Sequence, residues 1–277
     1  MNNIFTFFVP WEFAWLVQFS VWTILWLYCR GLQSGIKPGY WSISAFFIGL
    51  LLMYLVTQTR FDYWSQYMFF VHRGQHLVLH HLAPLLIVLA RPSKVLTAGM
   101  PISIQHWFSK QHYLKRGLLI IYRSLQQPII ACTLFVGLIW FWLTPSIHFD
   151  AMLSERLYWI MNWSMALDGL LFWWLMLENS HNGVTPRLRY GVRMLLLGLV
   201  MVPQIIIGAR LAFSQTEWFD VYAICGRAWP LSPIADQQLG GLITWIPAAM
   251  MSVIAALIVL RFMLKEDSTS IQNGAYK

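Results

Sequence analysis

Long apolar stretches separated by short polar connections recur from one end of the chain to the other. A helix needs about 20 apolar residues to cross the roughly 30 Å hydrocarbon core of a bilayer. Stretches of about that length occupy residues 12–30, 40–58, 68–90, 118–143, 155–178, 191–213 and 237–263. The pattern predicts an all-α, polytopic membrane helix bundle with seven transmembrane helices. We expect one domain over residues 1–265, followed by a cytoplasmic polar tail at 266–277.

The composition agrees with a membrane location. The chain has 277 residues, of which 58% are hydrophobic and 11% charged, whereas a soluble domain has about 25% charged residues. Many of the 16 Trp lie where apolar stretches begin or end, as they do in interfacial aromatic belts. An ordinary soluble domain is therefore excluded.

Lys and Arg alternate with the apolar stretches in a way that predicts the orientation. The first, third and fifth connections and the tail hold Arg30, Lys37, Arg91, Lys94, Lys110, Lys115, Arg116, Arg187, Arg189, Arg193, Arg261, Lys265 and Lys277. Because cytoplasmic loops carry the excess of basic residues, we expect the N-terminus outside and the C-terminus inside. The net charge of +8 then reflects topology, and no nucleic acid is implied as a partner.

Two further expectations concern the ends and connections. The first eleven residues contain no Lys or Arg, so a cleavable signal peptide is not expected and the first span should stay as an anchor. Residues 91–117 form the longest connection, which we expect to be a basic loop on the membrane surface.

The third span carries an unusual number of polar residues for a membrane helix. At 100° per residue, His72, His76 and His80 fall within an arc of about 80° and share one face. His81 points about 100° away from His80. Pro84 has no N–H to donate to the carbonyl of His80, so a helix kink and a free carbonyl acceptor are expected there. Buried polar groups in a membrane are functional candidates by default.

The fifth and seventh spans add polar residues at a similar depth. Met161, Asn162, Met165 and Asp168 lie within about 120° of one another on the fifth span. The seventh span begins with Asp236 and its neighbours and is interrupted by a second proline, at position 247. In the predicted topology the third, fifth and seventh helices all run from outside to inside. Most of these residues therefore fall in the outer half.

Imidazole and thioether groups are suitable copper ligands, and thioethers favour Cu(I). The predicted copper site consists of His72, His76, His80, Met161 and Met165. The polar residues expected to support it are Arg73, Gln75, Asn162, Asp168, Asp236 and Gln237, and the expected helix kinks are Pro84 and Pro247. Alternatives stay open: the histidines as hydrogen-bond partners of neighbouring helices, the methionines as packing residues, and Asp236 as the cap of its own helix.

Other chemistries find less support in the sequence. No HExxH or related zinc motif is present, and no nucleotide-binding loop supports ATP-driven transport. A haem bundle needs axial ligands on facing helices, but the intramembrane histidines all lie on one span. The remaining histidines, His106, His112, His148 and His181, fall in predicted loops. No haem is therefore expected.

Three segments resemble the CtaG-type cytochrome c oxidase assembly factors. They are HRGQHLVLHHLAPLLIVLARP (72–92), GLLFWW (169–174) and DQQLGGLITWIP (236–247), and the resemblance extends over about residues 40–262. It implies a seven-helix membrane protein that helps to mature haem–copper oxidase by supporting copper delivery. His72, Gln75, His76, Ala83, Pro84, Asp236, Gln237 and Gly241 match the family pattern.

The chain also departs from that pattern at several positions, which marks it as a divergent member. Arg73 stands where many members have Met, and Trp142 stands where members have a His near the end of the fourth span. Tyr158 and Asn162 stand where members have two histidines early in the fifth span. Met161 and Met165 are our candidates to replace these missing ligands.

The resemblance leads to a concrete expectation about function. The protein should be a non-enzymatic assembly factor of the bacterial inner membrane that helps copper enter the oxidase from the periplasmic side. Its expected partners are cytochrome c oxidase subunits, other assembly factors or copper chaperones, and the lipid bilayer. Two alternatives remain: a copper or proton transporter, and a metal-free scaffold for oxidase subunits.

Overall fold

The computed structural model describes residues 5–8, 10, 12–178 and 188–274, and their regular structure is helical throughout. The elements are α1 Phe5–Phe8, α2 Trp15–Gln33, α3 Tyr40–Gln58, α4 Arg60–Tyr67, α5 Phe69–Leu77, the π-helical turn η1 Val78–Leu82, α6 Ala83–Leu89, α7 Ser93–Gly99, α8 Ile102–Lys110, α9 His112–Leu125, α10 Pro128–Trp142, α11 Pro145–Leu153, α12 Glu155–Leu177, α13 Tyr190–Ala212, α14 Val221–Ile224 and α15 Pro233–Gly274. The all-α fold expected from the sequence is confirmed.

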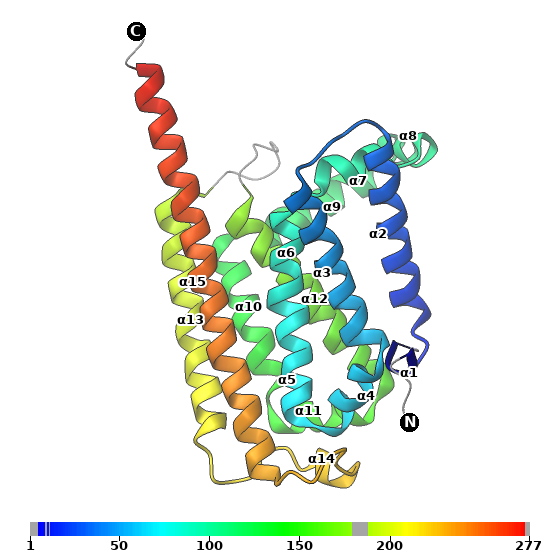
Figure 1. Cartoon of the computed structure of the whole chain (residues 1–277), viewed down its shortest axis with the longest axis vertical. Coiled ribbons are helices and arrows are strands. Elements are labelled where there is room, and N and C mark those ends of the chain that lie inside the picture. Colours follow the sequence, from blue (N-terminus) through cyan, green and yellow to red (C-terminus); the bar gives the residue numbers. More distant parts are fainter. Residues whose placement is uncertain (1–4, 9, 11, 179–187, 275–277) are drawn as a thin grey trace.

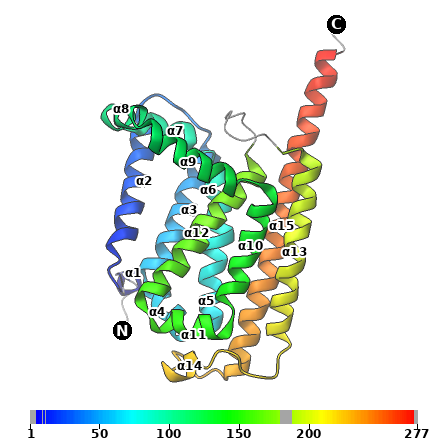
Figure 2. The same ribbon diagram turned by 180° about the vertical axis from the view of Figure 1, so that it is seen from behind.

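The long helices run alongside one another as a bundle (Figures 1 and 2). The pair α13 and α15 forms one edge, and α2 forms the opposite edge. The short helices α4, α11 and α14 lie at the end where α5, α12 and α15 begin, and α7 and α8 lie at the other end. Small residues let α13 and α15 approach closely: a Cβ on Gly241 would lie 2.7 Å from the carbonyl oxygen of Gly208.

Four helices are long and apolar enough to cross a membrane: α3, α12, α13 and the Pro233–Glu266 part of α15. Two bent pairs, Phe69–Leu89 with Ser93–Gly99 and His112–Leu125 with Pro128–Trp142, raise the number to six if each counts as one span. The described residues thus hold four to six candidate spans, and α2 is not among them.

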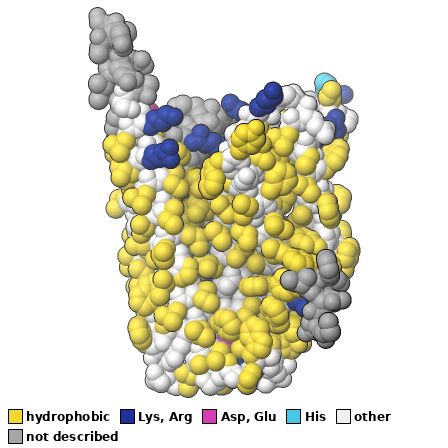
Figure 3. Space-filling model, viewed as in Figure 1, with side chains coloured by type: hydrophobic (Ala, Val, Ile, Leu, Met, Phe, Trp, Pro, Cys, Tyr) yellow, Lys and Arg dark blue, Asp and Glu magenta, His cyan; other side chains and the backbone are white. Residues whose placement is uncertain are grey.

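Lys and Arg side chains gather at one end of the bundle, whereas hydrophobic side chains cover the long middle band of the visible face (Figure 3). The basic end is the one from which the C-terminal part of α15 projects and near which α7 lies (Figure 1). The band of apolar side chains matches the exposed large hydrophobic residues of α2, α3, α12, α13 and α15. This distribution is typical of a protein surrounded by lipid.

The expected continuous span over 118–143 is wrong. The chain bends by 74° between α9 and α10, at Gln126 and Gln127. Pro128 begins α10, and a proline disfavours helical geometry in the residue before it. Gln127 accordingly has an extended conformation, with φ −66° and ψ 130°.

The structure adds detail to three other expectations. The stretch 91–117, expected as a basic loop on the membrane surface, contains α7, α8 and the start of α9. The expected polar tail from residue 266 continues α15 as far as Gly274. Pro247 lies inside α15, which is not interrupted there, and the helix kink expected at this proline stays a prediction.

The distortion expected at Pro84 takes the form of the π-helical turn η1. The amide of Ala83 donates to the carbonyl of Val78, five residues back, which widens the helix just before the proline. The carbonyl of His80 is free of the helix ladder, as predicted, and accepts a hydrogen bond of 3.1 Å from Nε1 of Trp173 on α12. Gly169 of α12 packs directly on this turn: a Cβ there would clash with the His80 carbonyl oxygen and lie 2.9 Å from its Cα.

The contact at Gly169 predicts a specific loss of stability. Gly169→Ala should lower the thermal unfolding midpoint of the purified protein, because the added methyl overpacks a backbone and costs about 1–3 kcal/mol. Gly198→Ala is the matched control, since a Cβ at this mid-helix glycine of α13 meets nothing within 4 Å. Equal midpoints for the two variants would contradict the close packing of α12 on η1.

Candidate functional site

The polar site starts at the first turn of α5, which a side chain from another helix caps. The carboxylate of Asp236, on α15, accepts hydrogen bonds from the backbone amides of Phe69 (3.0 Å) and Phe70 (2.8 Å). The first amides of a helix have no partner within the helix and need one from outside. Asp236 therefore caps α5 and not its own helix, the alternative that the sequence left open.

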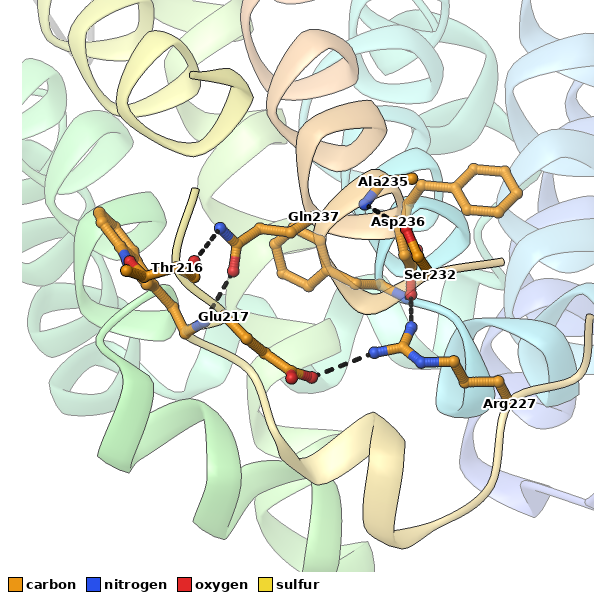
Figure 4. A network of polar contacts seen from close by, with 10 residues as sticks. Thr216, Glu217, Arg227, Ser232, Ala235, Asp236 and Gln237 are labelled. Carbon is orange, nitrogen blue, oxygen red and sulfur yellow. Dashed lines mark hydrogen bonds and ion pairs between the residues drawn. The ribbon is translucent and has the colours of Figure 1, made fainter. Parts of the chain in front are cut away.

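Arg227 and Gln237 hold the connection between α13 and α15 against this cap (Figure 4). The guanidinium of Arg227 lies between the carboxylates of Asp236 and Glu217, with its Nη1 bonded to Asp236. Gln237 accepts from the amide of Trp218 at 2.8 Å and donates to the carbonyl of Thr216 at 3.0 Å. The segment after α13 is thus fastened to the first turn of α15.

One helical turn into α5, three histidine rings lie in contact. The ring of His72 lies 4.4 Å from that of His76 and 5.1 Å from that of His148, measured between ring centres. All three side chains are buried. Neither ring nitrogen of His72 has a hydrogen-bond partner of ordinary geometry, which is unusual for a buried polar group, although the backbone of Ser65 lies close to the ring. His72 therefore carries an unused pair of potential ligand atoms at the centre of the cluster.

The structure adds His148 to the site, a residue that the sequence analysis assigned to a loop. It lies in the short helix α11. Its Nδ1 donates to the carbonyl of Trp142 at 3.0 Å, and its Nε2 accepts from the hydroxyl of Tyr222 at 2.9 Å. Burial lowers the pKa of His148 to about 3, so the ring is neutral at pH 7. A histidine that donates one N–H to a carbonyl is oriented as metal-bound histidines usually are.

One feature of the sequence could have indicated His148 as a site residue. It follows the end of the fourth predicted span by a few residues, near Trp142, where the resemblance leads to the expectation of a histidine. Trp142 has its own role, since its Nε1 donates to Ser164 at 3.0 Å. A short helix that folds back beneath the span brings His148 to His72, and hydrophobicity along the chain contains no sign of that fold-back.

His76 is already bonded at both ring nitrogens. Nη1 of Arg73 donates to its Nδ1 at 3.4 Å, and its Nε2 donates to Oδ1 of Asn162 at 3.3 Å. Arg73 is itself buried and donates from Nε to the hydroxyl of Thr244 at 2.9 Å. The guanidinium thus fixes one neutral tautomer of His76, which must exchange partners before it can bind a metal.

A second polar layer lies deeper in the bundle, beyond His76. His80 contacts Asp168 at 3.0 Å and His81 contacts Gln204 at 3.3 Å, each through Nε2. Their Nδ1 atoms have no partner. A cavity of about 10 Å³, the space of about one water molecule, is lined by His76, His80 and His81 together with Arg73, Met165 and Thr244. The sequence-predicted residues His80 and Met165 thus meet here, one layer below His72.

Met161 lies in the apolar wall around the histidine cluster. It is fully buried and belongs to a core of side chains that includes Phe69, Tyr158, Phe219 and Tyr222. The rings of Phe69 and Phe219 stack at 4.3 Å, and that of Phe219 lies 4.9 Å from that of His148. The segment containing α14 therefore covers the end of the site.

Beside the cluster, Asp62 organises a buried network that the sequence analysis missed. Its Oδ1 accepts from the hydroxyl of Tyr158 at 2.7 Å and from Nε2 of Gln75 at 2.8 Å, and its Oδ2 accepts from Gln66 at 3.1 Å. Burial raises the pKa of Asp62 to about 7, although these hydrogen bonds act in the opposite direction. Gln75 is thereby tied to α4 and does not face His72.

The fit of a metal to these residues can be tested on the geometry. Among the described residues, no group of three or more His, Cys, Asp or Glu side chains is placed to hold a metal ion. A zinc site of the closed, four-ligand kind is therefore not built into this end of the bundle. Cu(I) accepts fewer ligands. The ring nitrogens of His72 have no hydrogen-bond partner, whereas both ring nitrogens of His148 are bonded. His181 lies outside the described residues.

The fold and the site together are those of a helical bundle with several apolar helices compatible with a membrane and a buried histidine layer at one end. The family described as cytochrome c oxidase caa3 assembly factor (Caa3_CtaG) matches residues 23–266. The chain belongs to this family of oxidase assembly factors, as the sequence motifs predicted.

Relatives are found in mycobacteria. The chain is 30% identical over 212 residues to the uncharacterized protein Mb0105 of Mycobacterium bovis and to the uncharacterized protein MT0111 of Mycobacterium tuberculosis, which covers 69% of this chain and 29% of each relative. It is 25% identical over 286 residues to the uncharacterized protein ML1998 of Mycobacterium leprae, covering 96% of this chain and 41% of that relative. The chain thus spans less than half the length of these relatives. No solved structure matches it.

The raised pKa of Asp62 predicts a pH-dependent stability. Between about pH 4 and pH 7 the folded state binds more protons at this group than the unfolded state, so stability should fall as pH rises, by up to about 1.4 kcal/mol per pH unit. Asp62→Asn mimics the protonated group and should flatten this dependence in thermal unfolding measured across that range.

Asp150→Asn is the control, because Asp150 is exposed in α11 and should leave the slope unchanged. A wild-type stability that rises from pH 4 to pH 7 with a slope removed by Asp62→Asn would show the opposite sign, with the hydrogen bonds of Asp62 outweighing its burial.

Proposed function

We propose that this protein holds Cu(I) transiently at His72 and His148 and supports its delivery to a cytochrome c oxidase. The observation that carries the proposal is the buried His72 ring, whose two nitrogens have no partner while two further imidazoles contact it. Membership of the family suggests an oxidase as the client, and the unpartnered nitrogens are the reason for proposing a copper site here. Copper is cargo in this proposal and leaves with the client.

The proposed topology has seven spans with the N-terminus outside. The additional span that brings the number to seven is α2. Its 19 residues correspond to a length of about 28 Å, and it lies along the edge of the bundle (Figure 1). The basic end in Figure 3 supports the orientation, since basic residues favour the cytoplasmic side. The histidine cluster then lies at the outer, periplasmic end of a bacterial inner-membrane protein.

The proposed ligands are ranked by the hydrogen bonds that each histidine must break before it can bind a metal. His72 needs no exchange, and His148 needs only to lose the hydroxyl of Tyr222 from its Nε2. His76 would have to release both Arg73 and Asn162, so it is the third, conditional ligand. Few and exchangeable ligands suit a carrier, because the ion has to leave again.

The remaining sequence candidates occupy the layer below. His80 and Met165 line the small cavity next to His76, and Met161 belongs to the surrounding wall. Imidazole and thioether are ligands that Cu(I) accepts. We propose this layer as a secondary position for the ion and His72 as the primary one.

The polar layers invite a second candidate, a transporter that moves an ion or proton through the bundle. Beyond His81, however, the inner part is a packed apolar core that includes Phe135, Phe172, Trp173 and Met176. No cavity in that core continues the polar layers among the described pockets. The geometry therefore favours a carrier over a conduit, and proteoliposomes containing the protein should show no copper flux.

Copper binding by the purified protein tests the ligands. Anaerobic Cu(I) titration against a chromogenic chelator should show one site, and His72→Ala or His148→Ala should weaken it by at least about tenfold, as loss of a metal-site contact does. The titrations use the Cys225→Ser background, because this half-buried thiol is a strong copper ligand.

His81→Gln is the matched control for these variants. It replaces another fully buried histidine that keeps a polar side chain facing Gln204, and we expect wild-type affinity. The ligand assignment is wrong if His81→Gln weakens copper as much as His72→Ala, or if no variant changes the affinity.

A separate measurement distinguishes copper delivery from a metal-free scaffold. Cells that express His72→Ala with His148→Ala should retain co-purification of oxidase subunits with the protein but contain oxidase with a reduced copper content. Normal copper content in that oxidase, with co-purification intact, would favour the scaffold. Loss of co-purification in a correctly folded variant would show that the histidines serve partner binding.

A further inference from the structure

A groove opens on the membrane-facing side of the bundle between α2 and α12. Its outer part has a volume of about 680 Å³ and is lined by Phe13–Val17 on one side and by residues of α12 from Glu155 to Leu167 on the other. A deeper part of about 150 Å³ continues between α2, α3 and α12 as far as Leu170. Val17, Trp159, Trp163 and Leu167 line both parts, so the two form one continuous groove.

The groove exists because α2 contacts α7 and α3 but leaves its side towards α12 unpacked. Near its C-terminal end, α2 packs against α7, where a Cβ on Gly99 would lie 2.8 Å from the amide nitrogen of Gly31. Towards its N-terminal end, Gln18 donates to Gln58 of α3 at 3.0 Å. Trp15 and Leu16, which line the groove, are largely exposed. The side of α2 that faces α12 is therefore left open.

The groove is polar at its mouth and apolar at depth. Glu155 and Arg156 begin α12 and line the mouth. Glu12 directly precedes Phe13, which lines the groove, and burial together with the charge of Glu155 raises the pKa of Glu12. Two acidic groups and one basic group thus meet at the membrane interface. The deeper part is lined mainly by aliphatic and Trp side chains, among them Ile24, Leu50 and Leu79.

We propose that this groove binds a phospholipid with an amine headgroup, such as phosphatidylethanolamine. The ammonium group lies between Glu12 and Glu155, the phosphate accepts from Arg156, and one acyl chain fills the space beside Trp159 and Trp163. A cation between two carboxylates relieves their repulsion, and a guanidinium pairs well with phosphate. The polar mouth and apolar depth together match one amphiphile.

The dimensions decide between a lipid and a transmembrane helix of a partner. A helix with its side chains is about 10–12 Å across, and the deeper space of about 150 Å³ does not admit one. An extended acyl chain is much thinner and fits. The bound chain would also reach the carbon atoms of Asn162, which lines the groove and on its other side bonds His76. A lipid here supports the wall of the histidine site.

Native mass spectrometry of the full chain, exchanged into detergent with equal amounts of phosphatidylethanolamine and phosphatidylglycerol, tests the proposal. We expect one lipid to be retained, with phosphatidylethanolamine in clear excess. Arg156→Gln should weaken retention of both lipids about tenfold, the factor for one lost charge-assisted hydrogen bond. Glu12→Gln with Glu155→Gln should abolish the preference for the amine while leaving a lipid bound.

A third variant tests the depth of the groove. Ala166→Phe places a ring in the deeper space and should reduce retention of both lipids several-fold. Controls are Arg60→Gln, which removes an exposed Arg at the same end of the bundle, and Val202→Phe, which enlarges an exposed side chain of α13. Both should retain lipid as the wild type does, and all variants are compared at equal thermal stability and monodispersity.

Three results would overturn the proposal. They are retention without headgroup preference in the wild type, retention unchanged by Arg156→Gln and Ala166→Phe, and unchanged retention combined with loss of oxidase co-purification in Ala166→Phe. The last result would assign the groove to a partner helix. Copper affinity is measured separately, so failure of the lipid site leaves the copper proposal standing.

Discussion

The carboxylate of Asp236 joins three parts of the bundle and sets where the histidine helix begins. Inside a membrane protein, the free amides at the start of a helix need partners from the protein itself. Asp236 supplies them for α5 from the first turn of α15, and Arg227 neutralises its charge. Because α5 starts at this cap, His72 falls one turn further along, level with His148 on α11. The meeting of three imidazoles depends on that start point.

Apolar residues on both sides turn the polar layers into a closed chamber. On the side of α14 the stacked rings of Phe69 and Phe219 cover the histidines, together with Tyr222. On the opposite side the core around Phe135 and Trp173 closes the bundle. Several buried atoms between these walls lack a partner, among them Nδ1 of His80 and Nδ1 of His81, but His72 differs from both because neither of its ring nitrogens is bonded. Tyr222 both covers the chamber and occupies Nε2 of His148, so a movement of α14 would open the site and free a ligand together.

The periodicity of the sequence correctly predicted features that lie within a single helix. The spacing that placed His72 and His76 on one face agrees with their ring contact, and the missing N–H of Pro84 correctly freed the carbonyl of His80. The bend at Gln127 was also within reach, because the proline after it disfavours a helix, but the apolar residues on both sides of this short polar segment led us to expect a single span.

Contacts between distant segments were beyond the same reasoning. His148 lies in a connection whose fold-back depends on its packing against Phe69 and Phe219, and no local pattern encodes that packing. Asp236 stands at the start of α15 as a helix cap would, yet it caps α5, because its partners are set by how helices far apart in sequence align. Asp62 was missed for a similar reason: in sequence it is an ordinary acidic residue of a connection, and only the fold buries it.

Copper X-ray absorption spectroscopy on the anaerobically loaded protein tests the central claim most directly, because it identifies the ligand atoms themselves. In the Cys225→Ser background, the account predicts a low-coordinate Cu(I) with imidazole scattering from His72 and His148. That imidazole signal should be lost in the His72→Ala and His148→Ala double variant. A spectrum dominated by sulfur, or an imidazole signal unchanged in the double variant, would contradict a copper site at the His72 cluster.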